Sequence, residues 1–249
     1  GVSHGCIRIE KPYDFAVFLL ADKNKKLKEK VTKRYPEILN GVETVVNIAD
    51  EKRRYIVSRM MNKLMLQAER GLDVDPDKIL FVMIHRVTEQ KGFQLLLDAS
   101  EGIFKNLGFQ CIAGGGVSSG DRRGEEMAHG LWLLSQYYPG AANVALGFQE
   151  VSVPLLSGDI FCMPSMSEPG GISQLEALCC GALVVARATG GLRDTIFPLR
   201  KSGDKPEGNG FLFSDFNAWA FYDAMERAAK FFRENDEDTI YQARMNAEK

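Results

Sequence analysis

The sequence predicts an α/β protein with a Rossmann-like parallel sheet, helices on both of its faces, and a short irregular or helical N-terminal extension. Two observations support this prediction. From residue 79 onward, short apolar runs alternate with longer segments in which apolar residues recur at helical spacing. The first apolar run, Ile79 to Ile84, is continuous, which is typical of a parallel strand that is buried on both faces.

The predicted elements follow one another with short connections. The apolar runs predict six strands, at residues 79–84, 109–113, 144–146, 159–163, 183–186 and 210–213. Apolar spacing and flanking turn residues predict helices at residues 54–70, 93–107, 127–138, 172–180 and 192–197, and a last helix after Asn217. Gly181 is a typical C-terminal cap for the helix before it, and Asn217 is a typical N-cap. Parallel sheets of this kind bind ligands beyond the carboxyl ends of their strands.

The composition narrows the classes of partner. The 249 residues carry 31 basic and 33 acidic side chains, a net charge of −2. So balanced a chain has no overall field that attracts nucleic acid or an anionic membrane, and we predict neither as a partner. No apolar run approaches the roughly 20 residues of a membrane-spanning helix. The five cysteines include no Cys-x2-Cys pair and accompany only three histidines, which predicts no metal site and favours the reducing cytoplasm.

Two parts of the chain differ in composition. Residues 22–36 are highly charged and poor in core residues, so their composition predicts a linker or a solvated helix. This predicts an N-terminal extension over residues 1–35 and a Rossmann-like domain over residues 36–249. The first residue is Gly1 and not Met, from which we expect a fragment or a processed product.

Two loops at the carboxyl ends of predicted strands suit an anionic ligand. In the first, Arg86 and Lys91 flank the turn from strand to helix, where both cations can converge on one phosphate. In the second, Gly170 and Gly171 expose backbone N–H groups at the start of a helix. The partial positive charge of a helix N-terminus favours a diphosphate at that position.

Two carboxylates and a third loop complete the candidate site. Glu168 lies in the second loop, and Glu176 lies eight residues later on the following helix. Carboxylates placed in this way can accept hydrogen bonds from sugar hydroxyls on either side of a diphosphate. The third loop, Thr189, Gly190 and Gly191, again places small residues before a helix.

Each of these features also has a structural interpretation. Arg86 and Lys91 are consistent with solvated surface cations, and Glu176 with an exposed helix residue. Gly-Gly turns also form tight connections that bind nothing. Three such loops at one sheet edge favour a ligand site more strongly than any single loop does.

Three motifs resemble the nucleotide-sugar-binding half of the GT-B glycosyltransferases, specifically the bacterial glycogen synthases and plant starch synthases. They are RVTEQKG at residues 86–92, SEPGGISQLEA at residues 167–177 and ATGGLRDT at residues 188–195. The resemblance begins at residues 40–44 (NGVET) and extends to the helix after Asn217. It implies that the predicted sheet belongs to the C-terminal domain of a GT-B fold.

The resemblance implies a retaining transfer of glucose from ADP-glucose to the end of an α-1,4-glucan. UDP-glucose is the second choice of donor, another NDP-sugar such as GDP-mannose stays open, and no metal or other cofactor is implied. Arg86 and Lys91 would neutralise the departing diphosphate. Glu168 would hold the donor glucose, and Glu176 would hold the ribose. The positions whose backbone would approach the sugar and phosphates are Gly170, Gly171, Thr189, Gly190 and Gly191.

The sequence departs from the family at the donor loop and at the N-terminal side. The family usually has a cysteine at the position of Gly170 and an Arg-Phe pair where Met166 and Ser167 stand. Its N-terminal domain, which carries a Lys-x-Gly-Gly loop and most of the acceptor site, is missing, so we expect this domain to be a required partner. The alternative function is a non-catalytic nucleotide-sugar or glucan-binding module.

The opening residues resemble a different family. Ser-His-Gly-Cys-Ile-Arg at residues 3–8 resembles the catalytic motif of the L,D-transpeptidases. This resemblance implies Cys6 as the nucleophile, with His4 and Arg8 shaping its site. Only about 25 residues of such a domain are present, so we interpret them as a remnant in which Cys6 is inert, and keep the transpeptidase as the second alternative.

Overall fold

The structure is a computed structural model that describes residues 48–147, 152–202 and 205–247, and its contacts divide the chain into two compact units between Asp77 and Lys78. In the first unit, helix α4 spans Glu51–Glu69. It begins where the Asp50 carboxylate accepts a hydrogen bond from the N–H of Arg53 at 2.6 Å. The boundary predicted after residue 35 and the opening cysteine motif both lie outside the described residues.

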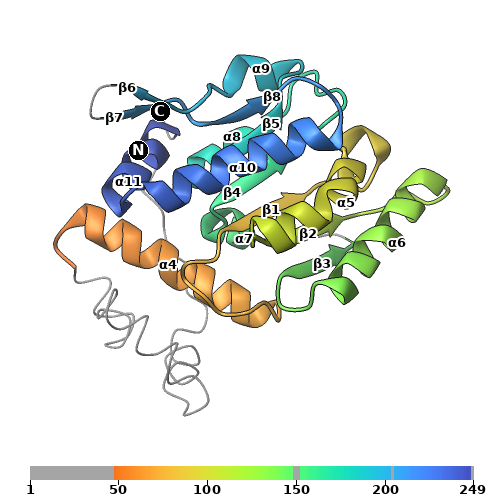
Figure 1. Ribbon diagram of the computed structural model, residues 1–249, viewed down its shortest axis with the longest axis horizontal. Coiled ribbons are helices and arrows are strands. Elements are labelled where there is room, and N and C mark those ends of the chain that lie inside the picture. Colours follow the sequence, from red (N-terminus) through yellow and green to blue (C-terminus); the bar gives the residue numbers. More distant parts are fainter. Residues whose placement is uncertain (1–47, 148–151, 203–204, 248–249) are drawn as a thin grey trace, which may run out of the picture. The chain divides into compact units, whose positions relative to one another are not determined.

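The second unit is built on one six-stranded parallel sheet (Figure 1). Its strands are β1 (Leu80–Ile84), β2 (Gln110–Gly115), β3 (Ala142–Leu146), β4 (Ile160–Met163), β5 (Leu183–Arg187) and β8 (Gly210–Phe213). The order across the sheet is β3-β2-β1-β4-β5-β8, and all neighbouring pairs are parallel. Every residue of β1, β2 and β4 is buried, as expected of strands covered on both faces. The predicted fold class and all six predicted strands are confirmed.

Helices cover both faces of the sheet. The longer ones are α5 (Phe93–Glu101), α6 (Arg122–Tyr137), α10 (Ala218–Glu234) and α11 (Glu237–Ala247). The shorter ones are η3 (Glu89–Lys91), η4 (Gly102–Asn106), α7 (Ser152–Ser157), α8 (Ser173–Cys179) and α9 (Gly191–Thr195). Helix α10 lies beside α5, which also contacts α6, whereas α7 and α11 contact α8 (Figure 1). Right-handed crossovers place these two groups on opposite faces.

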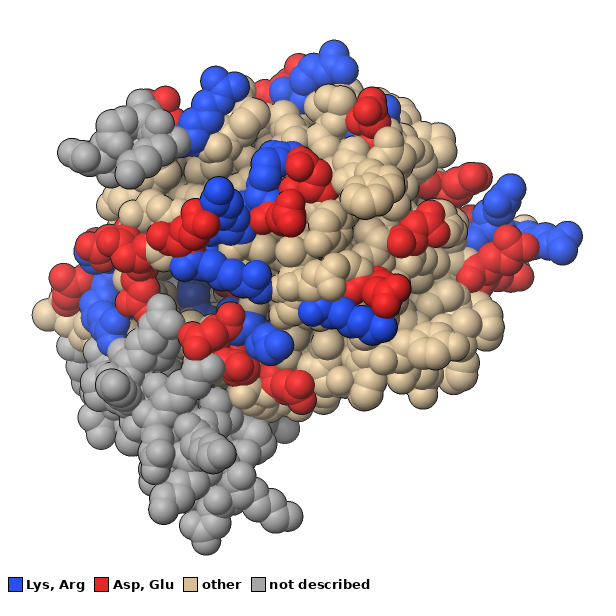
Figure 2. Space-filling model, in the orientation of Figure 1, with Lys and Arg blue, Asp and Glu red and all other residues tan. Residues whose placement is uncertain are grey.

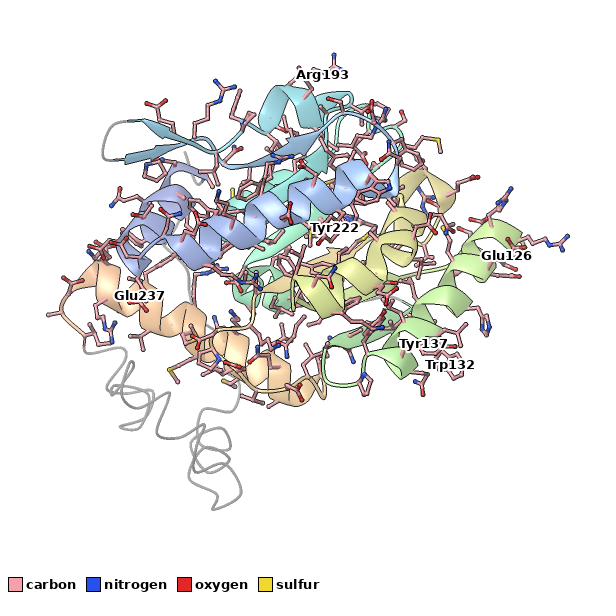
Figure 3. The ribbon with its side chains drawn as sticks, viewed as in Figure 1. Glu126, Trp132, Tyr137, Arg193, Tyr222 and Glu237 are labelled. Carbon is pink, nitrogen blue, oxygen red and sulfur yellow. The ribbon has the colours of Figure 1, made fainter. Side chains whose placement is uncertain are left out.

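The helix predicted over residues 93–107 changes its winding at Gly102. Beyond that residue the chain forms a π-helical turn, in which the N–H of Leu107 donates to the carbonyl of Gly102 at 2.9 Å. A Cβ atom on Gly102 would overlap the ring of Tyr222 on α10, which is labelled in Figure 3. The glycine therefore permits the close packing of α10 on this segment.

Helix α11, which the sequence pattern did not predict, holds the amino-terminal ends of two central strands. Its Arg244 forms a buried ion pair with Asp159, at 2.9 Å between Nη2 and Oδ1. The second carboxylate oxygen of Asp159 accepts the N–H of Leu80 at 3.0 Å, and Arg244 also donates to the carbonyl of Gly181. The start of β1 is thus tied to the start of β4, at the edge opposite the predicted loops. The antiparallel pair β6 (Arg200–Ser202) and β7 (Lys205–Glu207) was also not predicted.

Among the described residues, no helix is both long enough and apolar enough to cross a membrane.

Candidate functional site

The candidate site lies where the strand order of the sheet reverses. Strands β1 and β4 are neighbours although β2 and β3 lie between them in the sequence, and β5 follows β4. Because the strands are parallel, their carboxyl ends lie at one edge, and the loops after β1, β4 and β5 meet there. Open α/β sheets bind ligands at such a reversal point. All three loops that the sequence predicted to carry the site are therefore at the expected edge.

Lys91 and Glu168 form an ion pair across the first two loops. The distance from Nζ of Lys91 to Oε2 of Glu168 is 2.5 Å, and the two side chains are only 17% and 11% exposed. The hydroxyl of Ser165 donates to the same oxygen at 3.3 Å. Among the described residues Oε1 of Glu168 has no such partner, so it is the oxygen that a ligand hydroxyl can reach.

The glycines bring the second and third loops into backbone contact. The N–H of Gly191 donates to the carbonyl of Glu168 at 3.0 Å. A Cβ atom on Gly190 would overlap that same carbonyl, and one on Gly191 would overlap the carbonyl of Gly170. By contrast, a Cβ atom on Gly170 would have no atom within 4 Å. Gly190 and Gly191 are therefore needed for loop packing, whereas Gly170 borders open space.

Gln90 joins the first and second loops, a role that sequence analysis missed. The side-chain amide of Gln90 donates to the carbonyl of Ser167 at 2.9 Å, and the backbone carbonyl of Gln90 accepts the N–H of Met166 at 2.8 Å. Gly92 packs so closely that a Cβ atom there would overlap the carbonyl of Pro164. Gln90 lies inside the motif at residues 86–92, but nothing in a single sequence shows what its side chain contacts.

Arg187 holds the loop after β4 from its other side. Its guanidinium donates to the carbonyl of Met166 at 2.6 Å and to that of Ser214 at 2.9 Å. The guanidinium carbon also lies 5.6 Å from the ring centre of Phe216. Arg187 therefore links the second loop to the chain after β8, and sequence analysis did not single it out.

Arg86 and Glu176 lie at this edge of the fold but are not joined to the cluster. Both residues are exposed, Arg86 directly after β1 and Glu176 within α8. Neither side chain forms a hydrogen bond or ion pair with another residue in the described ranges. Thr189 is half-buried in the loop before α9. The structure thus brings together Lys91, Glu168 and the glycines, and leaves Arg86 and Glu176 facing solvent.

Charge over the visible face is mixed. In Figure 2, basic and acidic side chains alternate and no broad region of one sign appears. An anion must therefore be held by particular cations and N–H groups. Within the described ranges, no group of three or more His, Cys, Asp or Glu side chains is placed to hold a metal ion.

His85 is buried directly behind the ion pair. Its Nε2 lies 2.8 Å from the carbonyl of Cys162 and must donate, because a carbonyl only accepts. The ring also packs edge-on against Phe161 at 5.1 Å between ring centres. Burial lowers the pKa of His85 from 6.5 to about 4, with the Lys91 ammonium as a smaller contribution. The ring is therefore neutral at neutral pH and links β1 to β4 beneath the site.

We expect His85 to make folding less favourable in mild acid. The unfolded chain takes up this proton near pH 6.5, but the folded chain only near pH 4. As the pH falls through that window the unfolded state binds more protons, so the free energy of unfolding drops, by about 3 kcal/mol in all. Urea unfolding of the wild type and of His85→Gln, from about pH 7 to about pH 4, measures this fall in the free energy of unfolding. If the difference in the free energy of unfolding between the two proteins did not change with pH, the pH dependence would not come from His85.

Comparison with known proteins defines the class to which this fold and site belong. Residues 67–245 match the family described as glycosyl transferases group 1. The chain belongs to this family.

Within it, the chain is similar to glycogen and starch synthases. It is 37% identical over 202 residues to the glycogen synthase of Pasteurella multocida, covering 77% of this chain and 41% of that protein. A solved structure, the catalytic domain of starch synthase IV from Arabidopsis thaliana bound to ADP and acarbose, has a TM-score of 0.63 at 25% identity, covering 78% of this chain and 39% of the other.

A more distant structure shares the fold alone. The Anabaena protein HepE in complex with UDP has a TM-score of 0.58 at 18% identity, over 76% of this chain and 47% of that one. As for the glycogen synthases, this chain spans about two fifths of the length of those that it matches.

Proposed function

We propose that this chain binds a nucleotide-sugar donor and is the donor half of a retaining glycosyltransferase of the glycogen and starch synthase type. The donor proposed is ADP-glucose, the acceptor is the end of an α-1,4-glucan, and the chain acts in the cytoplasm. The observation that carries the proposal is the Lys91–Glu168 pair, which joins the first and second loops at the reversal point of the sheet. It provides a cation for phosphate beside a carboxylate for sugar hydroxyls.

Each side chain of the pair has unused hydrogen-bonding capacity. An ammonium has three N–H donors, of which Lys91 directs one to Glu168. The remaining donors can reach a phosphate oxygen, and Oε1 of Glu168 can accept from a sugar hydroxyl. This arrangement holds the sugar and the phosphate on either side of the bond that breaks. We propose that Glu176 accepts from the ribose, since its exposed carboxylate can reach a ligand above α8.

The proposed chemistry is stabilisation of the departing diphosphate. Negative charge grows on the phosphate oxygens as the bond to the sugar breaks. Fixed donors aimed at that charge stabilise the transition state more than the ground state. Lys91 is such a fixed donor because Glu168 and the surrounding loops hold it. Arg86 is exposed and unpaired among the described residues, so we propose that it closes onto the phosphate when the donor binds.

ADP is the proposed nucleotide because the starch synthase structure, which matches more of this chain at higher identity than HepE does, is bound to ADP. A Cβ atom on Gly170 would meet no described atom within 4 Å, so we propose that a donor can approach the backbone there.

Two alternatives are kept from the sequence. The first is a non-catalytic nucleotide-sugar or glucan-binding module, since Arg86 and Glu176 form no hydrogen bond or ion pair with Lys91 or Glu168 among the described residues. For the glycosyltransferase itself, we propose that the family's N-terminal domain is the partner needed for transfer. The L,D-transpeptidase alternative concerns Cys6, which lies outside the described residues, and no contact of the candidate site supports it.

Calorimetric titration with ADP-glucose and with UDP-glucose tests the proposal. We expect saturable binding of ADP-glucose that Arg86→Ala weakens about tenfold or more, because one charge-assisted contact contributes about 1.5 to 3 kcal/mol. Arg200→Ala, which removes another exposed arginine from β6, is the matched control and should bind like the wild type. No saturable heat with either donor would overturn the proposal. Binding without glucose transfer to a maltooligosaccharide would favour the binding module.

A further inference from the structure

Gln174 lies beneath the second loop and is completely buried. It is the second residue of α8, and its side-chain amide turns back toward the chain that leads into the helix. Nε2 donates to the carbonyl of Gly171 at 3.0 Å and lies 3.4 Å from that of Gly170. The same nitrogen lies 3.3 Å from the hydroxyl oxygen of Thr195 on α9. One amide group of α8 thus contacts both α9 and the loop that leads into α8.

The contact with Thr195 extends this connection to the third loop. The Thr195 hydroxyl donates to the carbonyl of Gly191 at 2.7 Å, so its oxygen is free to accept from Gln174. The chain of hydrogen bonds therefore runs from the carbonyls of Gly170 and Gly171, through two side chains, to the carbonyl of Gly191. These hydrogen bonds join the two glycine loops to each other.

The orientation of the amide follows from its neighbours. Three oxygen atoms surround one end of the Gln174 amide, and that end must be the NH2 group because the two carbonyls cannot donate. Among the described residues, Oε1 is left buried without a hydrogen-bond partner. A buried acceptor without a partner is unfavourable, whereas a methionine would fill a similar volume without that cost. The amide is therefore poorly explained by packing alone.

Gly171 shows how tightly the loop rests on this amide. Its φ of 75° is in the left-handed region, and a Cβ atom there would lie 2.5 Å from Oε1 of Gln174. A larger residue would therefore be strained by its backbone conformation and would displace either the loop or the amide. The second loop and Gln174 are thus in close contact at Gly171.

We propose that Gln174 is a positioning residue that sets the relative placement of the two glycine loops. Among the described residues the amide forms no hydrogen bond with Lys91 or Glu168. It acts instead by determining whether the N–H groups of both loops can face a donor at the same time. Thr195 acts with it as the connecting side chain. We call the hydrogen bonds of Gln174 and Thr195 that join the two loops the clamp. The inference rests on the proposed function for the identity of the donor, but the clamp itself is a property of the free protein.

Amide hydrogen exchange on the full chain without ligand tests the clamp directly. Three loop amides donate backbone hydrogen bonds: Met166 in the second loop, Gly191, which donates to Glu168, and Leu192 at the start of α9. We expect Gln174→Met to lower the protection of these amides about tenfold, with β1 and β2 unchanged. Leu178→Met, a volume-conserving change at another buried position of α8, is the matched control and should leave both loops protected. Protection of the loops within twofold of wild type would overturn the proposal. An equal loss of protection across the whole sheet would also overturn it, because it indicates a general structural role.

A second variant separates hydrogen bonding from packing. In Gln174→Glu, a protonated carboxyl group can still donate to Gly171, whereas a carboxylate would face three oxygen atoms. We expect wild-type protection of both loops at about pH 5 and about tenfold lower protection at about pH 8. Equal protection at the two pH values would contradict the role of the amide as a donor.

Binding measurements connect the clamp to the site. Gln174→Met and Thr195→Val should each weaken ADP-glucose binding about tenfold, and the double variant should be little worse than either one, because both interrupt one connection. Fully additive losses would overturn the connection between the loops. If the wild type binds no nucleotide sugar, the proposed function fails, and the exchange measurements still decide whether the clamp exists.

Discussion

Replacing Lys91 by methionine is expected to lower the free energy of unfolding by about 3 to 5 kcal/mol and to abolish donor binding. The change leaves the Glu168 carboxylate in a largely buried position with only the Ser165 hydroxyl beside it. Removing one partner of a buried ion pair is costly because the remaining charge is neither hydrated nor compensated. Urea unfolding and calorimetric titration of the same preparation measure the two effects.

The reciprocal variants separate stability from function. Glu168→Gln should also be destabilising, because it leaves the Lys91 ammonium without its carboxylate. The double variant Lys91→Met with Glu168→Gln removes both charges, so it should regain most of the lost stability and still fail to bind donor. A cost below about 1 kcal/mol for either single change would show that the pair behaves like an exposed salt bridge. Donor binding by the double variant would show that the pair is not part of the site.

Gly190→Ala is expected to destabilise the protein by at least about 2 kcal/mol and to displace the loop that carries Glu168. Gly190 has a φ of 46° and a ψ of −136°, a combination that residues with a side chain rarely adopt. An added Cβ atom would also overlap the carbonyl of Glu168. Backbone strain and overlap therefore act together, and urea unfolding measures their sum.

Gly170→Ala provides the matched control for this effect. Gly170 lies 20 positions earlier, has no positive φ, and borders open space. The same chemical change should therefore alter the free energy of unfolding by no more than about 0.5 kcal/mol. If the two alanine variants were equally stable, the close contact between the second and third loops would be wrong.

The strands were predictable because each one carries its signal locally. Continuous apolar runs such as ILFVMI identify buried parallel strands, and all six appear within two residues of the predicted positions. The missed elements lack that signal. Strands β6 and β7 read RKS and KPE, and α11 mixes polar and apolar residues with little periodicity. Its role depends on Arg244 reaching Asp159, 85 positions away, which no local pattern reveals.

The sequence identified several residues that meet at the candidate site, but not their contacts. The three motifs identified Lys91, Glu168 and the glycines, and the structure brings these residues together. The sequence assigned Lys91 to the phosphate and Glu168 to the sugar as separate groups, whereas the structure pairs them directly. Gln174 lies inside the motif at residues 167–177. Its burial and its contact with Thr195 nevertheless depend on how α8 and α9 are placed in the fold.

The sequence by itself determined which segments form the sheet and which loops leave its carboxyl edge. Apolar periodicity depends on neighbouring residues, and the geometry of parallel strands then places those loops at one edge. Only the tertiary structure decided that the Lys91 ammonium meets Glu168, 77 positions away, and that one buried amide joins two glycine loops. Such contacts arise from the order and spacing of strands in the sheet, which bring residues together irrespective of their separation along the chain.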